Sequence, residues 1–505
     1  MEEKNRIKRH SFQPGAMSII QMGEELIGHP STAINELVKN GYDADAISSR
    51  VYFHYSDIPE ESFAVIFDNG NGMDSPTLFG DWLKPSVSSK RSVNTKSEKF
   101  KRNFLGSKGI GRLASMALGE SVNVITRKRD TDDYNWITVN REAFREEKLL
   151  SEINFPGDQI SNFNSLFTDV NIIKERNQFE LQKKLKNYQS EDSKVKEILI
   201  QIAARNKNGV IRFLQLADLD SFSKGTLIVI ESLDNSILKI LRDEFAQTET
   251  SEATIEPYKT TEFYKSLATL ITPLTLNDQI QEELFKKGII KEKKAVASKI
   301  DNFTIEFATN LLPEQTGVEW LPIEPIPVQS VFDYRVFGKV TNEGDVNGLM
   351  AFNRLDNDSF ETEFTILKKD LDKEEDTQLK LFDDKRIKPG EYYFDIRIYD
   401  IGEKENLEKL AGKINLSSGS QFRKVFKNFQ GLRISKNGFG VKPYGEEVED
   451  WIELSKARVQ NPGQNVNTNQ ILGYVFFYSP ENDALEEKTN REGFQIGRAS
   501  CRERV

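Results

Sequence analysis

Glu36, Asn40 and Asp43 are the first residues of the sequence whose types and spacing could do chemistry. They lie in the segment STAINELVKNGYDADA, residues 31–46, at offsets of four and three, so on a helix capped at Ser31 they share one face. A buried face with two carboxylates and an amide needs a partner, and hydrated Mg²⁺ suits it because this ion takes few protein oxygens and accepts an amide oxygen. Glu36 would then be free to orient and deprotonate an attacking water. A solvated polar helix face is the alternative.

A second segment, FDNGNGMD at residues 67–74, follows an apolar run that has the composition of a strand. Gly70 and Gly72 stand at alternate positions and let the backbone come close to a flat ligand. The carboxylate of Asp68 at the strand end can accept a hydrogen bond from an exocyclic amine. Asn-Gly pairs also favour β-turns, so an ordinary turn is the alternative interpretation.

A third segment, GSKGIGRLASMALGE from residue 106 onward, combines glycines with a following helical pattern. Unhindered N–H groups and a helix N-terminus can bind an anion, and Lys108 and Arg112 add positive charge. The segment is not a Walker A motif, which needs a lysine after the final glycine. It is not a dinucleotide fingerprint either, because that motif needs a strand directly before it.

Together, in this order, the three segments resemble the N, G1 and G2 boxes of the GHKL ATPase superfamily, which includes gyrase B, heat-shock-90 chaperones, sensor histidine kinases and MutL. NELVKNGYDADA resembles the MutL and MORC form of the N box especially. Gly225 and Thr226, which precede LIVIESL, are similar to the later Gly-Thr box. The resemblance implies an α+β fold, with a Bergerat-type helix-on-sheet ATPase domain followed by a transducer domain similar to ribosomal protein S5.

The resemblance also implies a role for each matching residue. Glu36 would be the general base, Asn40 the Mg²⁺ ligand and Asp68 the residue that reads adenine. Gly70 and Gly72 would form the floor of the base pocket, while Asp43 and Thr226 would support it. The remaining residues of the ATP-binding set are Met73, Gly106, Lys108, Gly109, Ile110 and Gly111. The spacing in the G2 box differs among relatives.

The chain between the second and third segments is strongly basic. Residues 84–112 hold nine Lys or Arg against one acid, Glu98. In GHKL proteins this region is the ATP lid, so we expect it to close over the triphosphate. A mobile, solvated segment without that role is the alternative.

The elements that must position these residues are short strands rich in β-branched and aromatic residues: VYFHY (51–55), FAVIFD (63–68), VNVITR (122–127), WITVN (136–140) and TLIVIESL (226–233). The ATPase domain is predicted at residues 1–234, with a helical insertion at 141–222. A helical connector is predicted at 235–300 and the transducer domain at 301–495. TNREG resembles the arginine loop of the heat-shock-90 chaperones, which implies that Arg491 reaches the γ-phosphate from that domain, with Lys442 as the second candidate. A surface arginine in a charged segment is the alternative.

The composition limits the class of protein. The chain has 505 residues, 69 Lys or Arg and 79 Asp or Glu, which gives a formal net charge of −10, and 37% of it is hydrophobic. These values exclude wholesale disorder and collagen. No apolar run is long enough to cross a bilayer and no signal peptide is evident, so a cytoplasmic protein without a membrane partner is expected. The single cysteine, Cys501, cannot form an internal disulfide.

The last ten residues, IGRASCRERV, resemble the translation of a sequencing adapter. We therefore expect residues 496–505 to be an artefact and the transducer domain to be truncated.

The combined expectation is an Mg²⁺-dependent ATPase that binds and slowly hydrolyses ATP and couples the nucleotide state to closure of a homodimer. A protein-remodelling chaperone and a nucleotide-gated scaffold without turnover are the alternatives. A protein client or DNA stays open as the partner. A sensor histidine kinase is disfavoured, because His10 has too little chain before it for a dimerisation helix and His29 lies too close to the N box.

Overall fold

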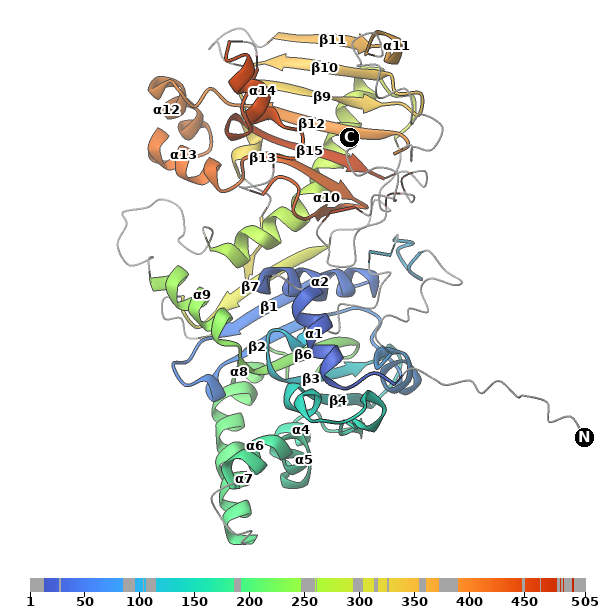
Figure 1. The fold of residues 1–505 in the computed structure, drawn as a ribbon, viewed down its shortest axis with the longest axis vertical. Helices are drawn as coiled ribbons and strands as arrows, with labels where there is room; N and C mark the ends of the chain where they lie inside the picture. Colours follow the sequence, from blue (N-terminus) through green and yellow to red (C-terminus); the bar gives the residue numbers. More distant parts are fainter. Residues whose placement is uncertain are drawn as a thin grey trace, which may run out of the picture. The chain divides into compact units, whose positions relative to one another are not determined.

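A computed structural model gives the fold of the chain (Figure 1). It divides into two compact units: residues 1–94, 106–241 and 308–320 form the first, and residues 95–105, 242–307 and 321–505 form the second. The structure describes residues 13–26, 29–84, 96–102, 104–105, 115–185, 192–246, 259, 261–293, 303–312, 317–324, 327–353, 360–371, 389–446, 450–463, 465–478, 482, 485 and 493–494.

An antiparallel sheet forms the centre of the first unit, and its last two strands, β7 and β8, fall mostly in ranges counted with the second. Its strand order is β5-β4-β3-β6-β2-β1-β7-β8, and each strand pair with a defined register is antiparallel. The strands are β1 (Ser48–His54), β2 (Phe63–Asp68), β3 (Gly119–Arg127), β4 (Tyr134–Asn140), β5 (Gly157–Ile160), β6 (Gly225–Leu233), β7 (Thr304–Thr309) and β8 (Leu321–Pro322). The five strands expected from β-branched and aromatic composition are β1, β2, β3, β4 and β6, so that prediction is confirmed.

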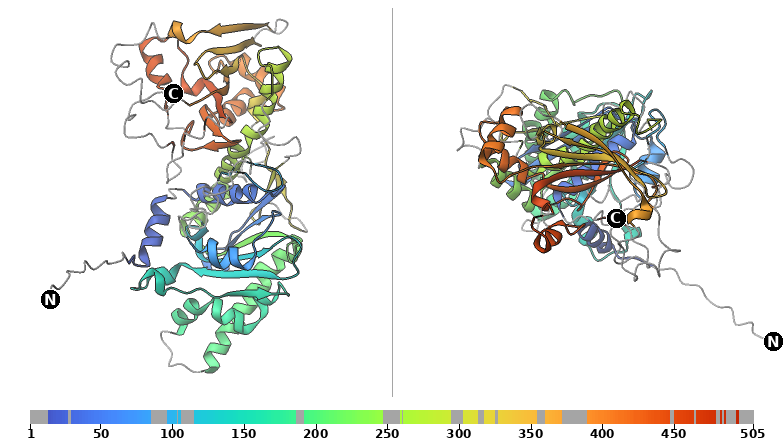
Figure 2. Two further views of the ribbon diagram at one scale, coloured as in Figure 1. Left: turned by 90° about the vertical axis from the view of Figure 1, so that its right-hand side faces the viewer. Right: turned by 90° about the horizontal axis from the view of Figure 1, so that it is seen from above.

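Helices cover both faces of this sheet (Figures 1 and 2). Helix α1 (Met17–Leu26) contributes Ile19 and Ile20 to a cluster with Val139 of β4, and α2 (Pro30–Asp43) packs on the same face. The opposite face carries Val65 and Val229, which pack against side chains of the segment predicted as an insertion. Because both faces are buried, the strands are nearly continuous apolar runs, and alternation with polar residues is weak.

The described part of residues 141–222 contains several helices and one strand. The helices are α4 (Ser165–Thr168), α5 (Val170–Arg176), α6 (Gln178–Leu185), α7 (Asp192–Asn206) and α8 (Arg212–Leu216). The strand is β5, which pairs with β4 at the edge of the sheet. The segment is therefore helical over most of its described length but also extends the sheet.

A buried ion pair holds this segment to the sheet. The guanidinium of Arg176, at the end of α5, lies 2.7 Å from Glu231 Oε2 on β6 and donates to Asn123 Oδ1 on β3 at 3.0 Å. It also donates to the carbonyl of Leu166 at 2.7 Å. Only 1% of the Arg176 side chain is exposed, so the charge depends on these partners for its solvation.

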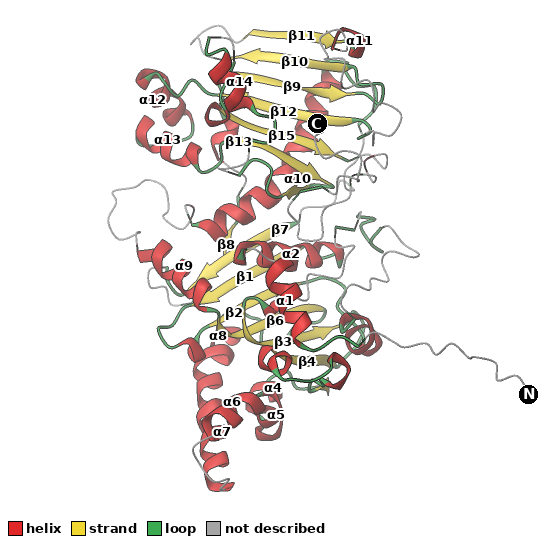
Figure 3. Cartoon of the chain, viewed as in Figure 1, coloured by secondary structure: helices red, strands yellow, loops and turns green. Residues whose placement is uncertain are grey.

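The second unit contains a seven-stranded sheet in the order β11-β10-β9-β12-β15-β13-β14 (Figure 3). All of its strand pairs are antiparallel except β13 with β15, which is parallel. The strands are β9 (Tyr334–Val340), β10 (Val346–Phe352), β11 (Phe360–Ile366), β12 (Tyr392–Ile398), β13 (Gly431–Lys436), β14 (Phe439–Val441) and β15 (Ile471–Phe477). The helices are α10 (Glu262–Lys286), α11 (Lys368–Leu371), α12 (Lys404–Lys413), α13 (Gly419–Lys427) and α14 (Leu454–Gln460), while α9 (Asn235–Ala246) follows β6 of the first sheet.

Short 3₁₀ and π turns complete the described chain. They are η1 (Pro59–Glu61), η2 (Pro76–Trp82), η4 (Arg141–Arg145), η5 (Leu150–Glu152), η6 (Lys207–Ile211), η9 (Pro327–Ser330) and η11 (Thr468–Gln470).

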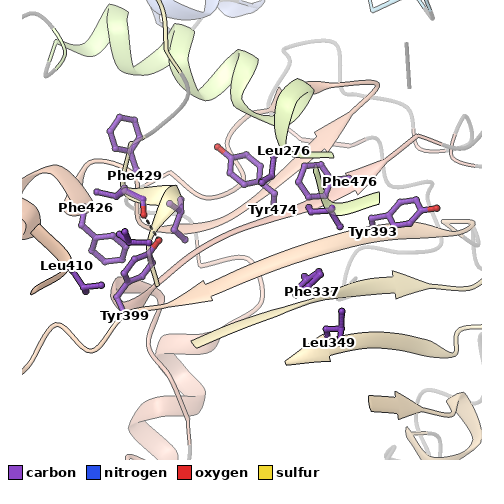
Figure 4. Packing of buried hydrophobic residues seen from close by; sticks show 14 of the residues in the cluster. Leu276, Phe337, Leu349, Tyr393, Tyr399, Leu410, Phe426, Phe429, Tyr474 and Phe476 are labelled. Carbon is purple, nitrogen blue, oxygen red and sulfur yellow. Dashed lines mark hydrogen bonds between the residues drawn. The ribbon is translucent and has the colours of Figure 1, made fainter. Parts of the chain in front are cut away.

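The core of the second unit lies between α10, the helices α12 and α13, and one face of the sheet. Leu276 of α10 packs with Phe337, Tyr474 and Phe476, and Figure 4 shows these side chains together. The hydroxyl of Tyr399 donates to the carbonyl of Val328 at 2.8 Å, which satisfies a polar group inside the cluster.

The same face also buries a charged group. Arg335 of β9 and Arg397 of β12 both donate to the carboxylate of Asp395, which has no exposed side-chain surface. Burial raises the pKa of Asp395, but the two guanidinium groups outweigh that effect and bring it to about 2.

The fold class predicted from the sequence, α+β with a helix-on-sheet first domain, is confirmed. The likeness of the second unit to ribosomal protein S5 and the boundaries at 234, 300 and 495 stay predictions. The basic segment at 84–112 is described only in part, and residues 496–505 lie outside the described chain.

Candidate functional site

Helix α2 carries the first group of candidate residues. It begins after His29, whose side chain accepts a hydrogen bond from the Ser31 N–H at 3.2 Å. The cap predicted at Ser31 is therefore wrong by two residues, because Pro30 lacks an N–H and takes the first helical position.

The three polar residues of α2 differ in exposure. Glu36 and Asp43 are buried, with exposed fractions of 5% and 4%, while Asn40 is exposed. The carboxylates are thus held within the protein, and the amide of Asn40 meets solvent one turn away from Glu36.

A lysine that the sequence analysis missed accompanies Glu36. Lys39 Nζ lies 3.2 Å from Glu36 Oε1, and both side chains are buried. The ammonium offsets part of the cost of burying the carboxylate. The spacing of a glutamate three residues before a lysine on a helix was the available signal.

The end of β2 carries Asp68, which is half-buried and has a protein hydrogen bond at one of its two carboxylate oxygens. The Gly70 N–H donates to Oδ1 at 2.9 Å, and within the described residues no donor reaches Oδ2. Burial raises the pKa of Asp68 to about 6, while the Gly70 hydrogen bond and the charge of Lys224 limit the rise. At neutral pH the carboxylate is therefore charged and acts only as an acceptor.

The loop after Asp68 is fastened to the end of α2 and to the start of β1. The Asn71 N–H donates to the carbonyl of Ala44 at 2.8 Å. Asn69 Oδ1 accepts from the N–H groups of Ile47 and Ser48 at 2.9 and 3.1 Å. The structure therefore brings the N and G1 segments together.

Two glycines make this arrangement sterically feasible. A Cβ on Gly41 of α2 would lie 2.8 Å from Asp68 Cβ, so the helix could not pass as close to β2 with a larger residue. Gly72 has a φ of +68°, and a Cβ there would lie 1.9 Å from the carbonyl oxygen of Arg127.

A row of polar side chains runs across the same face of the sheet. Residues directly opposite each other in antiparallel strands point to the same face, so the strand register defines the row. Its members on β1, β2, β6, β3, β4 and β5 are Ser49, Asp68, Thr226, Thr126, Asn135 and Gln159.

Thr226, predicted from the Gly-Thr box, lies in this polar row next to Asp68. Its hydroxyl is 3.1 Å from that of Thr126, which also donates to the carbonyl of Gly225 at 2.9 Å. Thr126 and Asn135 were not predicted. They belong to no motif, and only the strand register places them beside the loop.

Met73 is joined to this row by its backbone. Its N–H donates to Thr126 Oγ1 at 2.9 Å, and its carbonyl accepts from Asn135 Nδ2 at 3.1 Å. The polar row thus connects Asp68, Thr226 and Met73.

The remaining candidate residues are not placed relative to this row. Gly106, Lys108, Gly109, Ile110, Gly111 and Arg491 lie outside the described residues. Lys442 belongs to the second unit, where its Nζ lies 3.5 Å from Glu446 Oε1.

The side chains of the site can be compared with the two groups that the sequence implies, a Mg²⁺ ion and the exocyclic amine of adenine. Among the described residues, no three His, Cys, Asp or Glu side chains come together as a metal site. Mg²⁺ carried by phosphates and water needs few protein ligands, and an exposed amide such as that of Asn40 can supply one. The second oxygen of Asp68 fits an exocyclic amine.

No helix in the described ranges is both long enough and apolar enough to span a bilayer.

Comparison with known proteins gives one family. Residues 29–171 match the family described as "Histidine kinase-, DNA gyrase B-, and HSP90-like ATPase". The matched range includes α2, β2, β3 and β4 and ends before Thr226. None of the curated proteins matches the chain.

Proposed function

Since residues 29–171 form an ATPase domain of the GHKL superfamily, we propose that this protein binds ATP with Mg²⁺ and hydrolyses it slowly. Domains of this superfamily bind ATP and generally hydrolyse it. The residues on α2 and at the end of β2 support the same activity for this chain.

The observation that carries the proposal is the carboxylate of Asp68. It is partly buried, charged at neutral pH and held by Gly70 at one oxygen only. Its second oxygen can accept a hydrogen bond from the amine of adenine. Thr226 on the neighbouring strand adds a hydroxyl beside it.

Glu36 is the residue that we assign as general base. It is buried on α2, the helix whose end is fastened to the loop after Asp68. A carboxylate in this position orients the attacking water and takes its proton as the water attacks the γ-phosphate. Positioning and electrostatic stabilisation supply most of the rate in such a transfer.

Asn40 would hold Mg²⁺ through its amide oxygen, together with the phosphates and water. When bound, the ion neutralises charge on the phosphate oxygens. Asp43 and Thr226 are assigned supporting roles, and Gly70 and Gly72 form the backbone next to the base.

One observation favours a second candidate, a nucleotide-gated scaffold that binds ATP without turnover. The ammonium of Lys39 lies 3.2 Å from the carboxylate of Glu36. It competes for the lone pairs that must accept the proton of the water, so it opposes hydrolysis.

The decisive experiment compares the unaltered chain with Glu36→Gln. Phosphate release is measured with Mg²⁺ and ATP, and binding is measured with a fluorescent ATP analogue. We expect Glu36→Gln to lose turnover by about 100-fold or more and to keep binding, because general base catalysis contributes factors of about 10² to 10⁴. Binding without turnover in the unaltered chain supports the scaffold, and no binding contradicts both candidates.

We also propose that ATP closes a homodimer, as the resemblance to MutL, MORC and heat-shock-90 proteins implies. The second unit would then act as the transducer. Light scattering with and without a non-hydrolysable ATP analogue tests this: the expected mass doubles with nucleotide, and a constant monomer mass contradicts the proposal.

A further inference from the structure

We propose that Thr126 is a positioning residue that makes the site select adenine over guanine, by fixing the direction of the Thr226 hydroxyl and the place of the Met73 backbone. The inference rests on the proposed ATP binding. It concerns the strand residue behind the site, which belongs to none of the three sequence motifs.

The hydrogen bonds of Thr126 use its hydroxyl completely. A hydroxyl has one proton to donate and two lone pairs to accept with. The proton goes to the carbonyl of Gly225 at 2.9 Å, and one lone pair accepts the Met73 N–H at 2.9 Å. The other lone pair faces Thr226 Oγ1 at 3.1 Å.

The hydrogen bonds of Thr126 determine whether the Thr226 hydroxyl can donate to a ligand or only accept from it. Since Thr126 has given its proton to Gly225, the hydroxyl of Thr226 must donate to Thr126 in the 3.1 Å contact. Thr226 then offers only lone pairs to a ligand. Asp68, directly opposite on β2, also offers only lone pairs at neutral pH.

Two neighbouring acceptors select between the purine bases. Adenine carries an amine at the position where guanine carries a carbonyl oxygen. An amine donates to acceptors, whereas a carbonyl placed against two acceptors is left without a donor and loses its bonds to water. The polar row therefore favours adenine and rejects guanine.

The same residue also fixes the loop beside the base. Met73 is held at its N–H by Thr126 and at its carbonyl by Asn135 Nδ2, 3.1 Å away. Asn135 in turn accepts from Gln159 Nε2 at 2.9 Å. Thr126 is fully buried and 4% of Asn135 is exposed, so these bonds lie within the protein and competition from water is weak.

The test uses a matched pair of variants, Thr126→Val and Thr126→Ser. Valine keeps the shape of threonine and removes the hydroxyl, whereas serine keeps the hydroxyl. The Kd values for ATP and GTP are measured by competition with a fluorescent ATP analogue, and thermal melting shows that each variant is folded.

We expect Thr126→Val to lower the selectivity for ATP over GTP by about tenfold, the factor that corresponds to about 1.4 kcal/mol, the size of one buried hydrogen bond. The Thr226 hydroxyl is then free to rotate and donate to guanine. In turnover assays the change falls on KM for ATP more than on kcat. Thr126→Ser retains the selectivity.

A folded Thr126→Val variant with the selectivity of Thr126→Ser overturns the inference and leaves ATP binding standing. If the unaltered chain binds no ATP, the proposed function fails, and the inference fails with it. If Thr126→Val does not fold, Asn135→Ala provides the second measurement. This variant frees the Met73 carbonyl, and we expect a KM for ATP at least threefold higher; an unchanged KM contradicts the inference.

Discussion

At the scale of single residues, Asp68 links the chemistry of the site to pH. One of its oxygens accepts from Gly70, and the other accepts no hydrogen bond from the described residues. A proton on that carboxylate removes an acceptor from the position where the amine of adenine would bind. The affinity of the site is therefore expected to depend on the charge of this one group.

We predict that the affinity for ATP falls as the pH is lowered through about 6, the pKa of Asp68. Asp68→Asn should weaken ATP binding by about 10- to 100-fold at pH 7.5, the value of one charged hydrogen bond, and should remove this pH dependence. Titrations with a fluorescent ATP analogue between pH 5 and pH 8 test it. The same midpoint in both proteins would contradict the assignment.

The buried pair of Lys39 and Glu36 is expected to matter for stability as well as for the reaction. Lys39→Met leaves the Glu36 carboxylate buried without its ammonium partner. We expect the free energy of unfolding to fall by about 3 to 5 kcal/mol in urea titrations. The double variant Lys39→Met with Glu36→Gln removes both charges and should recover most of the loss. Additive losses would show that the two charges do not interact.

At the scale of elements, the register of the strands determines which residues outside the motifs lie beside the site. The N and G1 segments could be recognised in the sequence because each is a continuous motif. Thr126 and Asn135 could not, because their role comes from standing opposite Thr226 and Gln159 in neighbouring strands. Register depends on long-range pairing, which no local pattern in this sequence specifies.

Strand prediction depended on burial. FAVIFD and TLIVIESL were recognised because both faces of their sheet are covered, so they are apolar almost throughout. β11, with the sequence FETEFTI, was missed because it is an edge strand in which no side chain is buried. β5, with the sequence GDQI, was missed for the same reason, and its residues have low strand propensity.

The docking of α5 on the first sheet gives a prediction at this scale. Arg176→Met removes the ion pair with Glu231 and the bonds to Asn123 and Leu166. We expect the free energy of unfolding to fall by about 3 to 5 kcal/mol, because the buried Glu231 carboxylate loses its ionic partner and keeps only the hydrogen bond from Asn123 Nδ2. Urea titration followed by circular dichroism measures it. Lys194→Ala, at an exposed pair with Glu197 on α7, is the control and should cost less than about 1 kcal/mol.

At the scale of the whole molecule, two buried carboxyl groups, one in each unit, respond to acid in opposite directions. The pKa of Asp68 is raised by folding from 3.8 to about 6, so its contribution stabilises the first unit at low pH and is lost as the pH rises through 6. The pKa of Asp395 in the second unit is lowered from 3.8 to about 2. Its contribution is present above about pH 4 and is lost as the pH falls towards 2.

Lys128 and Thr77 also lower the pKa of Asp74 in the first unit to about 2, but 37% of that side chain is exposed, so solvent screens its contribution. We therefore predict that the second unit unfolds first when the pH is lowered from 4 to 2, with a loss on the order of 2 kcal/mol from Asp395. Trp451 is the only tryptophan of the second unit, so its fluorescence reports on that unit. Trp82, Trp136 and Trp320 report on the first. Trp451→Phe should remove the early fluorescence transition and keep the later one, and a single transition in both proteins would contradict the prediction.

The two hydrogen bonds of the Met73 backbone should slow the exchange of its amide proton with solvent. Backbone protons in a loop without secondary structure usually exchange with solvent quickly, since they need little opening to reach it. The Met73 amide proton instead points to the hydroxyl of a fully buried threonine. It can exchange only when the loop separates from β3. The exchange rate of this one amide therefore reports how often the site opens, and it can be measured without a bound ligand.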